Sequence, residues 1–84
     1  MPTKAVSKFN KTSHRPVEIE ILNGIVRIKL VNGDVLNTPL ARHPWLAKAT
    51  PEQRNNYDLG YASIWWPDLD DGLDIEWLLM QPSE

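Results

Sequence analysis

The sequence lacks cysteine, and it has no long hydrophobic run among its 84 residues. Without cysteine the chain forms neither a disulfide nor a thiolate metal site. No apolar stretch approaches the roughly 20 residues that a membrane-spanning helix needs. Residues 1–15 also lack the apolar segment of a secretory signal. These absences exclude a disulfide-stapled secreted domain, and we expect a cytoplasmic protein that does not bind a membrane.

Motifs of catalysis and metal binding are missing as well. There is no nucleophile elbow and no glycine-rich phosphate loop, and neither His14 nor His43 has the spacing of a metal ligand. The acidic segment 68–74 fails as a calcium loop, because Leu73 and Leu79 stand where such a loop needs glycine and glutamate. A chain this short can hardly build a deep catalytic cleft. We therefore expect no enzyme activity, no cofactor and no metal.

What is present is the material for one small domain. Hydrophobic residues make up 42% of the chain and charged residues 24%, which is enough for a single thin core. The net charge of −2 hides an asymmetry, since residues 1–15 carry +4 and residues 50–84 carry −7. We predict a basic, flexible N-terminal arm over 1–15, a single domain over 16–80 and a tail over 81–84.

Apolar and polar residues alternate from Val17 to Leu30 and predict a β-hairpin around Asn23-Gly24. Both central residues of a type I′ turn need positive φ, which asparagine and glycine tolerate best. This turn places Leu22 across from Ile25. It also places aliphatic pairs on one face of the hairpin and pairs of unlike charge on the other face. The further predicted pairs are Ile21–Val26, Ile19–Ile28 and Val17–Leu30 on the apolar face, and Glu20–Arg27 and Glu18–Lys29 on the polar face.

A second turn at Asn32-Gly33 leads into a predicted third strand over 36–40. Its register stays open at this point. A two-residue turn pairs Leu30 with Val35, whereas a bulged turn pairs Leu30 with Leu36.

The second half of the sequence combines helix-start signals with one strand. Pro44 suits the first turn of a helix. Thr50 and Gln53 form the pattern of a capping box that starts a helix over about 51–57. Residues 59–66 predict a strand, and Asp74 can cap a last helix through residue 80. The expected fold class is therefore α+β: one small antiparallel sheet of three to four strands packed with short helices.

An open edge of this sheet is expected near Thr38 or Ser63. Unpaired edge strands can add a strand from a second chain. A homodimer is therefore one of the partnerships that the sequence predicts.

Two of the four tryptophans are adjacent. In a strand Trp65 and Trp66 point to opposite faces. One of them can lie in the core while the other is exposed or covered by a partner, and exposed tryptophan is typical of binding hot spots. Which of the two is exposed stays open, as does a packing in which the chain itself covers both faces.

Three blocks of sequence carry a family resemblance. They are His43-Pro44-Trp45-Leu46-Ala47, Ala49-Thr50-Pro51-Glu52-Gln53-Arg54-Asn55 and Ile64-Trp65-Trp66-Pro67-Asp68-Leu69-Asp70. In this order, within residues 16–80, the chain closely resembles the bacterial family catalogued as domain of unknown function 2442. The resemblance implies a small α+β domain without a catalytic motif. It also implies a gene beside that of another small family (domain of unknown function 4160), as in a toxin–antitoxin pair.

Some relatives in this family carry an added helix-turn-helix domain. Nothing after Met80 is long enough for one, so we do not expect sequence-specific DNA binding. Arg54 is the residue of the three blocks that helix initiation leaves unexplained. We favour a structural role in which it pairs with Asp68 or Asp70 and docks the helix on the strand; the alternative is that it faces a partner.

These observations predict a non-enzymatic protein-interaction module, an antitoxin-like or accessory partner of a small protein encoded by an adjacent gene. The tryptophan strand and the acidic segment would bind a basic or apolar surface of that protein. The alternative is a nucleic-acid-binding or regulatory accessory protein that acts through its basic arm. The candidate partner-binding residues are Trp65, Trp66, Asp68, Asp70, Asp71 and Arg54.

Overall fold

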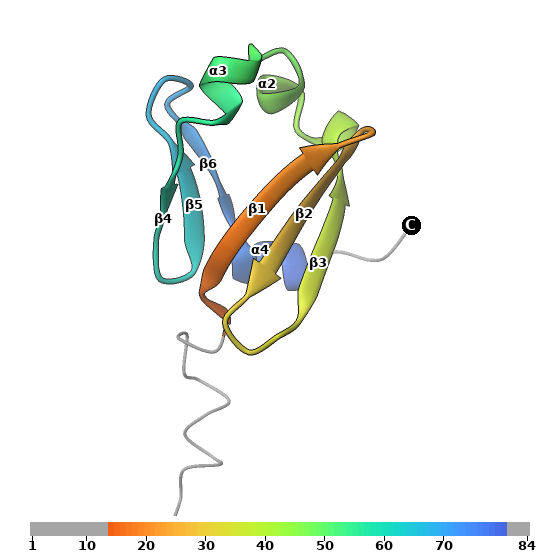
Figure 1. Ribbon diagram of the computed structural model, residues 1–84, viewed down its shortest axis with the longest axis vertical. Coiled ribbons are helices and arrows are strands. Elements are labelled where there is room, and N and C mark those ends of the chain that lie inside the picture. The colour runs from red at the N-terminus through yellow and green to blue at the C-terminus, as the bar shows by residue number, and fades with distance from the viewer. Residues whose placement is uncertain (1–13, 81–84) are drawn as a thin grey trace, which may run out of the picture.

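The computed structural model describes residues 14–80, which form two three-stranded antiparallel sheets and a few short helices (Figure 1). The predicted α+β class is confirmed. The N-terminal sheet consists of β1 (Pro16–Leu22), β2 (Ile25–Leu30) and β3 (Val35–Pro39), in that order. The C-terminal sheet consists of β4 (Asp58–Leu59), β5 (Ser63–Trp66) and β6 (Asp71–Asp74), in that order. Most of the predicted arm and the whole predicted tail lie outside the described residues.

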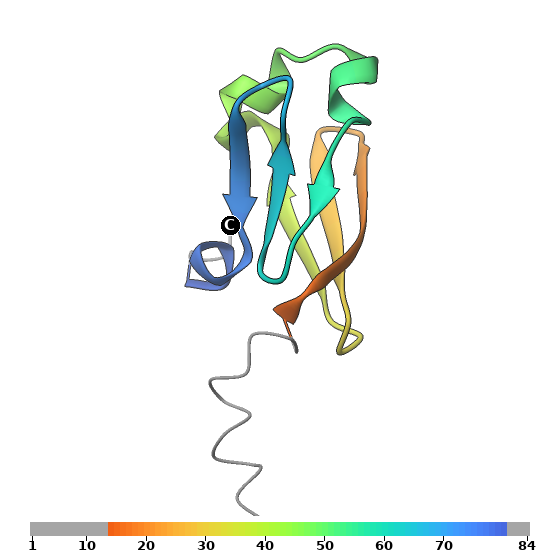
Figure 2. The same ribbon diagram turned by 90° about the vertical axis from the view of Figure 1, so that its left-hand side faces the viewer.

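The helices are short and lie at the ends of the sheets. A 3₁₀ turn (Leu40–Arg42), α2 (Pro44–Ala47) and α3 (Pro51–Arg54) connect β3 to β4, and α4 (Ile75–Met80) follows β6. Helices α2 and α3 cover one end of the two sheets and α4 lies at the other (Figures 1 and 2). The long connection through α2 and α3 carries the chain away from β3, so β4 starts a new sheet instead of extending the first.

The first hairpin forms as predicted, with one shift of register. Asn23 (φ 54°) and Gly24 (φ 77°) take the two positive-φ positions of the turn. All predicted pairs form except the last, because Leu30 lies opposite Pro16 and not opposite Val17. A bulge beside Pro16 causes the shift. Proline has no N–H to give to the ladder, so the irregularity falls where a backbone bond is already missing.

Both registers considered for the second hairpin are wrong. Leu30 pairs with Asp34 across a three-residue loop: the N–H of Leu30 donates to the Asp34 carbonyl at 2.8 Å. The Gly33 N–H donates to the Leu30 carbonyl at 3.0 Å, and Gly33 alone in this loop has a positive φ, at 98°. This is a type I turn followed by a left-handed residue, which needs one glycine and not an Asn-Gly pair. The resulting pairs are Lys29–Val35, Ile28–Leu36, Arg27–Asn37, Val26–Thr38 and Ile25–Pro39.

The predicted strand over 59–66 is a hairpin. The chain reverses after Leu59, where the Gly60 N–H donates to the Ser63 carbonyl at 2.8 Å. The segment 71–74, which the sequence did not predict as a strand, pairs with β5 as the third strand. The expectation of a single sheet is therefore wrong, because a second sheet faces the first. Ser63 lies in a central strand and is no open edge, while Thr38 lies in edge strand β3 with its side chain buried.

The predicted helix starts are confirmed. Thr50 and Gln53 form the complete capping box of α3, although the helix ends at Arg54 and is shorter than expected. Pro44 occupies the first position of α2. The Asp74 carboxylate accepts from the backbone N–H of Glu76 at 3.0 Å and thereby caps α4.

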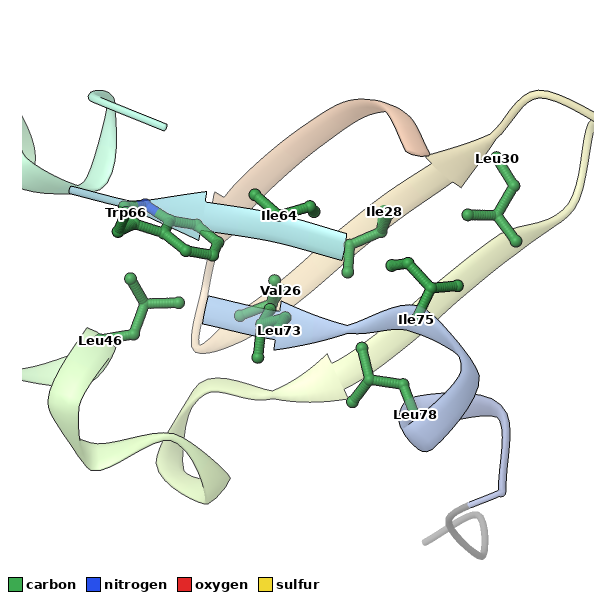
Figure 3. Packing of buried hydrophobic residues seen from close by; sticks show 9 residues of the cluster. All are labelled: Val26, Ile28, Leu30, Leu46, Ile64, Trp66, Leu73, Ile75 and Leu78. Atoms are coloured by element: carbon green, nitrogen blue, oxygen red, sulfur yellow. The ribbon is translucent and has the colours of Figure 1, made fainter. Parts of the chain in front are cut away.

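The hydrophobic core lies between the two sheets. Side chains of β2 point toward those of β5 and β6, with α2 and α4 closing the ends (Figure 3). Strand alternation places one face of each sheet in this layer. The buried hydrophobic residues are Val26, Ile28, Leu30, Leu46, Ile64, Trp66, Leu73, Ile75 and Leu78.

Candidate functional site

The two adjacent tryptophans have opposite environments. Trp66 is 0% exposed and points into the core, whereas Trp65 is 44% exposed. The indole N–H of Trp66 donates to the Arg54 carbonyl at 2.9 Å. Its ring meets Trp45 edge-on at 5.6 Å between centroids and lies 6.0 Å from the ring of Tyr57. Trp66 is therefore a core residue that packs against Trp45, Tyr57 and the end of α3. Its role in partner binding stays a prediction that its complete burial does not support.

Trp65 lies in the centre of the outer face of the C-terminal sheet. Its neighbours across the strands are Asp58 on β4 and Gly72 on β6. A Cβ atom at Gly72 would lie 3.0 Å from Cε3 of Trp65, so the indole covers the bare backbone of this glycine. By strand alternation, the residues that share this face, which we call the Trp65 surface, are Asp58, Ser63, Trp65, Gly72 and Asp74.

The Trp65 surface is acidic. Asp58 and Asp74 are its two charged members, and both are exposed. Asp58 was not predicted as a site residue, because the strand expected over residues 59–66 does not include it. Gly60 was the available signal, since an isolated glycine in a strand pattern often marks a reversal.

The carboxylates of the acidic segment do not gather at one point. Asp68 accepts from the side-chain amide of Asn56 at 2.9 Å, and Asp70 sits in the β5–β6 turn with a φ of 52°. Asp71 accepts from the Gly72 N–H at 2.8 Å. Within residues 14–80 no group of three or more metal-ligating side chains comes together.

Arg54 has a structural role, as favoured from the sequence, but with other partners than those expected. Its Nε donates to the carbonyl of Leu46 at 3.2 Å and its Nη2 to the carbonyl of Ala47 at 2.8 Å. The pairing with Asp68 or Asp70 is thus wrong. The last carbonyls of a helix lack intrahelical donors, and a guanidinium from the next helix can satisfy two of them at once. Arg54 therefore joins α3 to the end of α2, and partner binding by Arg54 stays a prediction.

His43 is buried, which its sequence context did not reveal. It is the N-cap residue of α2, and its Nε2 lies 3.0 Å from the hydroxyl of Thr38. Burial lowers the pKa of the imidazole below its ordinary value of 6.5, and the positive charge of Arg42 lowers it further. Asp71 opposes both effects. The imidazole serves as a buried, neutral link between β3 and α2.

The basic N-terminal arm lies outside the described residues except for His14 and Arg15. The prediction of nucleic-acid binding depends on that arm, so it stays a prediction. Among the helices of residues 14–80, none is long and apolar enough to cross a membrane.

Comparison with known proteins identifies the family. Two small antiparallel sheets with short helices at their ends define a small α+β domain. A family model matches this chain over residues 16–81. The chain belongs to this family, which is described as "Protein of unknown function (DUF2442)". No curated protein and no solved structure matches the chain.

Proposed function

We propose that this chain is a cytoplasmic protein-interaction module that binds a basic surface of another small protein through the Trp65 surface. Its partner would be the product of an adjacent gene, with this chain as the antitoxin-like or accessory half of the pair. The observation that carries the proposal is the exposure of Trp65 at the centre of a face whose two charged residues are both acidic.

The chemistry of this face suits a lysine or arginine side chain. An exposed indole attracts a cation to its face, and a carboxylate beside it can form a charge-assisted hydrogen bond with the same cation. Asp58 lies directly across the strand from Trp65 and can supply that carboxylate. Tryptophan buried at the centre of an interface is a frequent hot spot, while the charge of −7 over residues 50–84 would speed the encounter with a basic partner.

The test is copurification of the chain with the product of the adjacent gene. We expect Trp65→Ala to reduce the captured partner at least tenfold and Asp58→Asn to reduce it less. Tyr61→Ala is the matched control, because Tyr61 is an exposed aromatic residue of the β4–β5 turn and not a member of the Trp65 surface. It should leave binding unchanged.

Circular dichroism of each variant establishes that the fold is intact. Binding that is absent for the unaltered chain, or that survives Trp65→Ala at full strength, would show that the Trp65 surface is not the partner site.

A further inference from the structure

Strand β1 is an edge of the N-terminal sheet, and its outward backbone groups have no partner among the residues that the structure describes. In a hairpin with a two-residue turn, the residues that flank the turn exchange hydrogen bonds, and every second residue does so thereafter. Leu22, Glu20 and Glu18 therefore bond to β2, and the N–H and C=O groups of Ile19 and Ile21 point away from it. Within residues 14–80 no strand or loop hydrogen-bonds to these outward groups.

A groove of about 320 Å³ runs beside these unpaired groups. It is lined by Ile19, Glu20 and Ile21 of β1 together with Pro51, Arg54, Asn55 and Tyr57, and the guanidinium of Arg54 is already bonded to the carbonyls of α2. Figures 1 and 2 show β1 at the rim of its sheet, on the side of α3 and β4. Both isoleucines are half-buried, so an apolar side chain entering the groove would complete their burial.

The charge of β1 selects the occupant of this edge. Glu18 and Glu20 stand on the outer face of the strand, opposite Lys29 and Arg27 of β2, and the Glu20–Arg27 ion pair spans 4.0 Å. Ile19 and Ile21 face inward. On the free side of β1 the two glutamates are the charged groups that an added strand would meet first. A strand added here would place alternate side chains beside the glutamates and beside the groove. A second copy that paired through its own β1 around Ile19 or Glu20 would put glutamate opposite glutamate, which is destabilising. A segment that alternates basic and apolar residues satisfies both faces.

We propose that β1 accepts an extended segment of a partner protein, with alternating basic and apolar side chains, as a fourth strand of the N-terminal sheet. The backbone of the segment bonds to Ile19 and Ile21, its apolar side chains enter the groove, and its basic side chains lie beside Glu18 and Glu20. The β1 edge belongs to a different sheet from the Trp65 surface, so this proposal does not depend on the function proposed above.

The experiment is a titration of the full chain with the capped hexapeptide Lys-Val-Lys-Val-Lys-Val. Calorimetry measures the affinity, and amide NMR locates the binding site. We expect saturable binding, with slowed hydrogen exchange at the N–H groups of Ile19 and Ile21. Two control peptides separate the contribution of the main-chain hydrogen bonds from that of the charge. A version N-methylated at alternate residues cannot form the main-chain bonds, and Glu-Val-Glu-Val-Glu-Val reverses the charge; each should bind at least tenfold more weakly.

Two protein variants complete the test. The double variant Glu18→Gln/Glu20→Gln should bind the basic and the acidic peptide with more similar affinities than the unaltered chain does. Trp65→Ala should leave the affinity for the basic peptide unchanged. The proposal is overturned by an absence of binding at millimolar peptide, by equal binding of the N-methylated peptide, or by loss of binding in Trp65→Ala. Concentration-dependent dimerisation that Ile19→Pro abolishes would assign the edge to a second copy instead.

Discussion

The imidazole of His43 and the hydroxyl of Thr38 form a buried hydrogen bond of 3.0 Å that joins the start of α2 to strand β3. His43 is 4% exposed and Thr38 is 5% exposed. A buried imidazole is tolerated in its neutral form and disfavoured in its charged form. The burial of His43 therefore makes the stability of this small domain sensitive to pH.

We expect the free energy of unfolding to fall as the pH drops from 7 toward 5. The unfolded chain binds a proton at His43 near the ordinary pKa of 6.5, whereas burial lowers that pKa in the folded chain. Protons then favour the unfolded state below 6.5, so the contribution of His43 is complete above that pH. It is lost as the pH falls from 6.5 toward the folded pKa. Urea unfolding followed by tryptophan fluorescence at several pH values measures this slope.

The matched variants for this prediction are His43→Gln and Thr38→Val. His43→Gln should make the free energy of unfolding less dependent on pH between 7 and 5.5, although the variant is less stable overall. Thr38→Val leaves the buried imidazole without its partner and should cost about 1–3 kcal/mol at pH 7. Equal slopes for the unaltered chain and His43→Gln would refute a role of His43 in the pH response.

Gly72→Ala should destabilise the C-terminal sheet. A Cβ atom at this position would lie 2.5 Å from the carbonyl oxygen of Ile64 and 3.0 Å from the Trp65 ring. The carbonyl belongs to the ladder and cannot move aside, so we expect a loss of about 1–3 kcal/mol or more in denaturant unfolding. Gly60→Ala is the control, because its closest contact would be the small Ser63 side chain at 3.2 Å. A similar loss for both variants would contradict this reading of Gly72.

Trp66→Phe and Trp65→Phe should differ in stability. Trp66→Phe removes the donor to the Arg54 carbonyl, and the unpaired carbonyl alone costs about 1–3 kcal/mol. Trp65→Phe keeps an aromatic ring on the outer face and should change stability by less than about 1 kcal/mol. Thermal unfolding of both variants gives the comparison. A larger loss for Trp65→Phe would mean that the wrong tryptophan has been assigned to the core.

Arg54→Met should destabilise the helical end of the domain. It keeps the aliphatic stem and removes two hydrogen bonds to the carbonyls of α2, which should cost about 1–3 kcal/mol. Arg27→Met removes an exposed arginine whose ion pair with Glu20 spans 4.0 Å, and it should stay within about 0.5 kcal/mol. Equal effects in chemical denaturation would show that Arg54 acts only as a surface charge.

Several local features were predictable because the interactions that cause them span only a few residues. The type I′ turn depends on Asn23 and Gly24 alone, and the cap of α3 depends on Thr50 and Gln53. The three-residue loop at Gly33 was missed because its local signal is ambiguous. Asn-Gly is the usual pair of a two-residue turn, and only the pairing of Leu30 with Asp34 shows that Gly33 closes a three-residue loop here.

The candidate site was predictable only in part. Trp65 was among the expected residues, but Asp58 was missed, because it joins the surface through pairing with a strand that begins beyond a reversal. The partners of Arg54 were misjudged, since backbone carbonyls at the end of α2 compete with the carboxylates that the sequence displays.

The sequence by itself determined the turn at Asn23-Gly24, the helix caps and the opposite orientation of the two adjacent tryptophans, because these depend on backbone conformation and strand alternation. Only the tertiary structure decided that there are two sheets, that Trp66 and not Trp65 is buried, and that β1 is an edge strand of its sheet. Each of these depends on which distant segment packs against which face. That choice is made by contacts between residues far apart in the chain, which no local pattern contains.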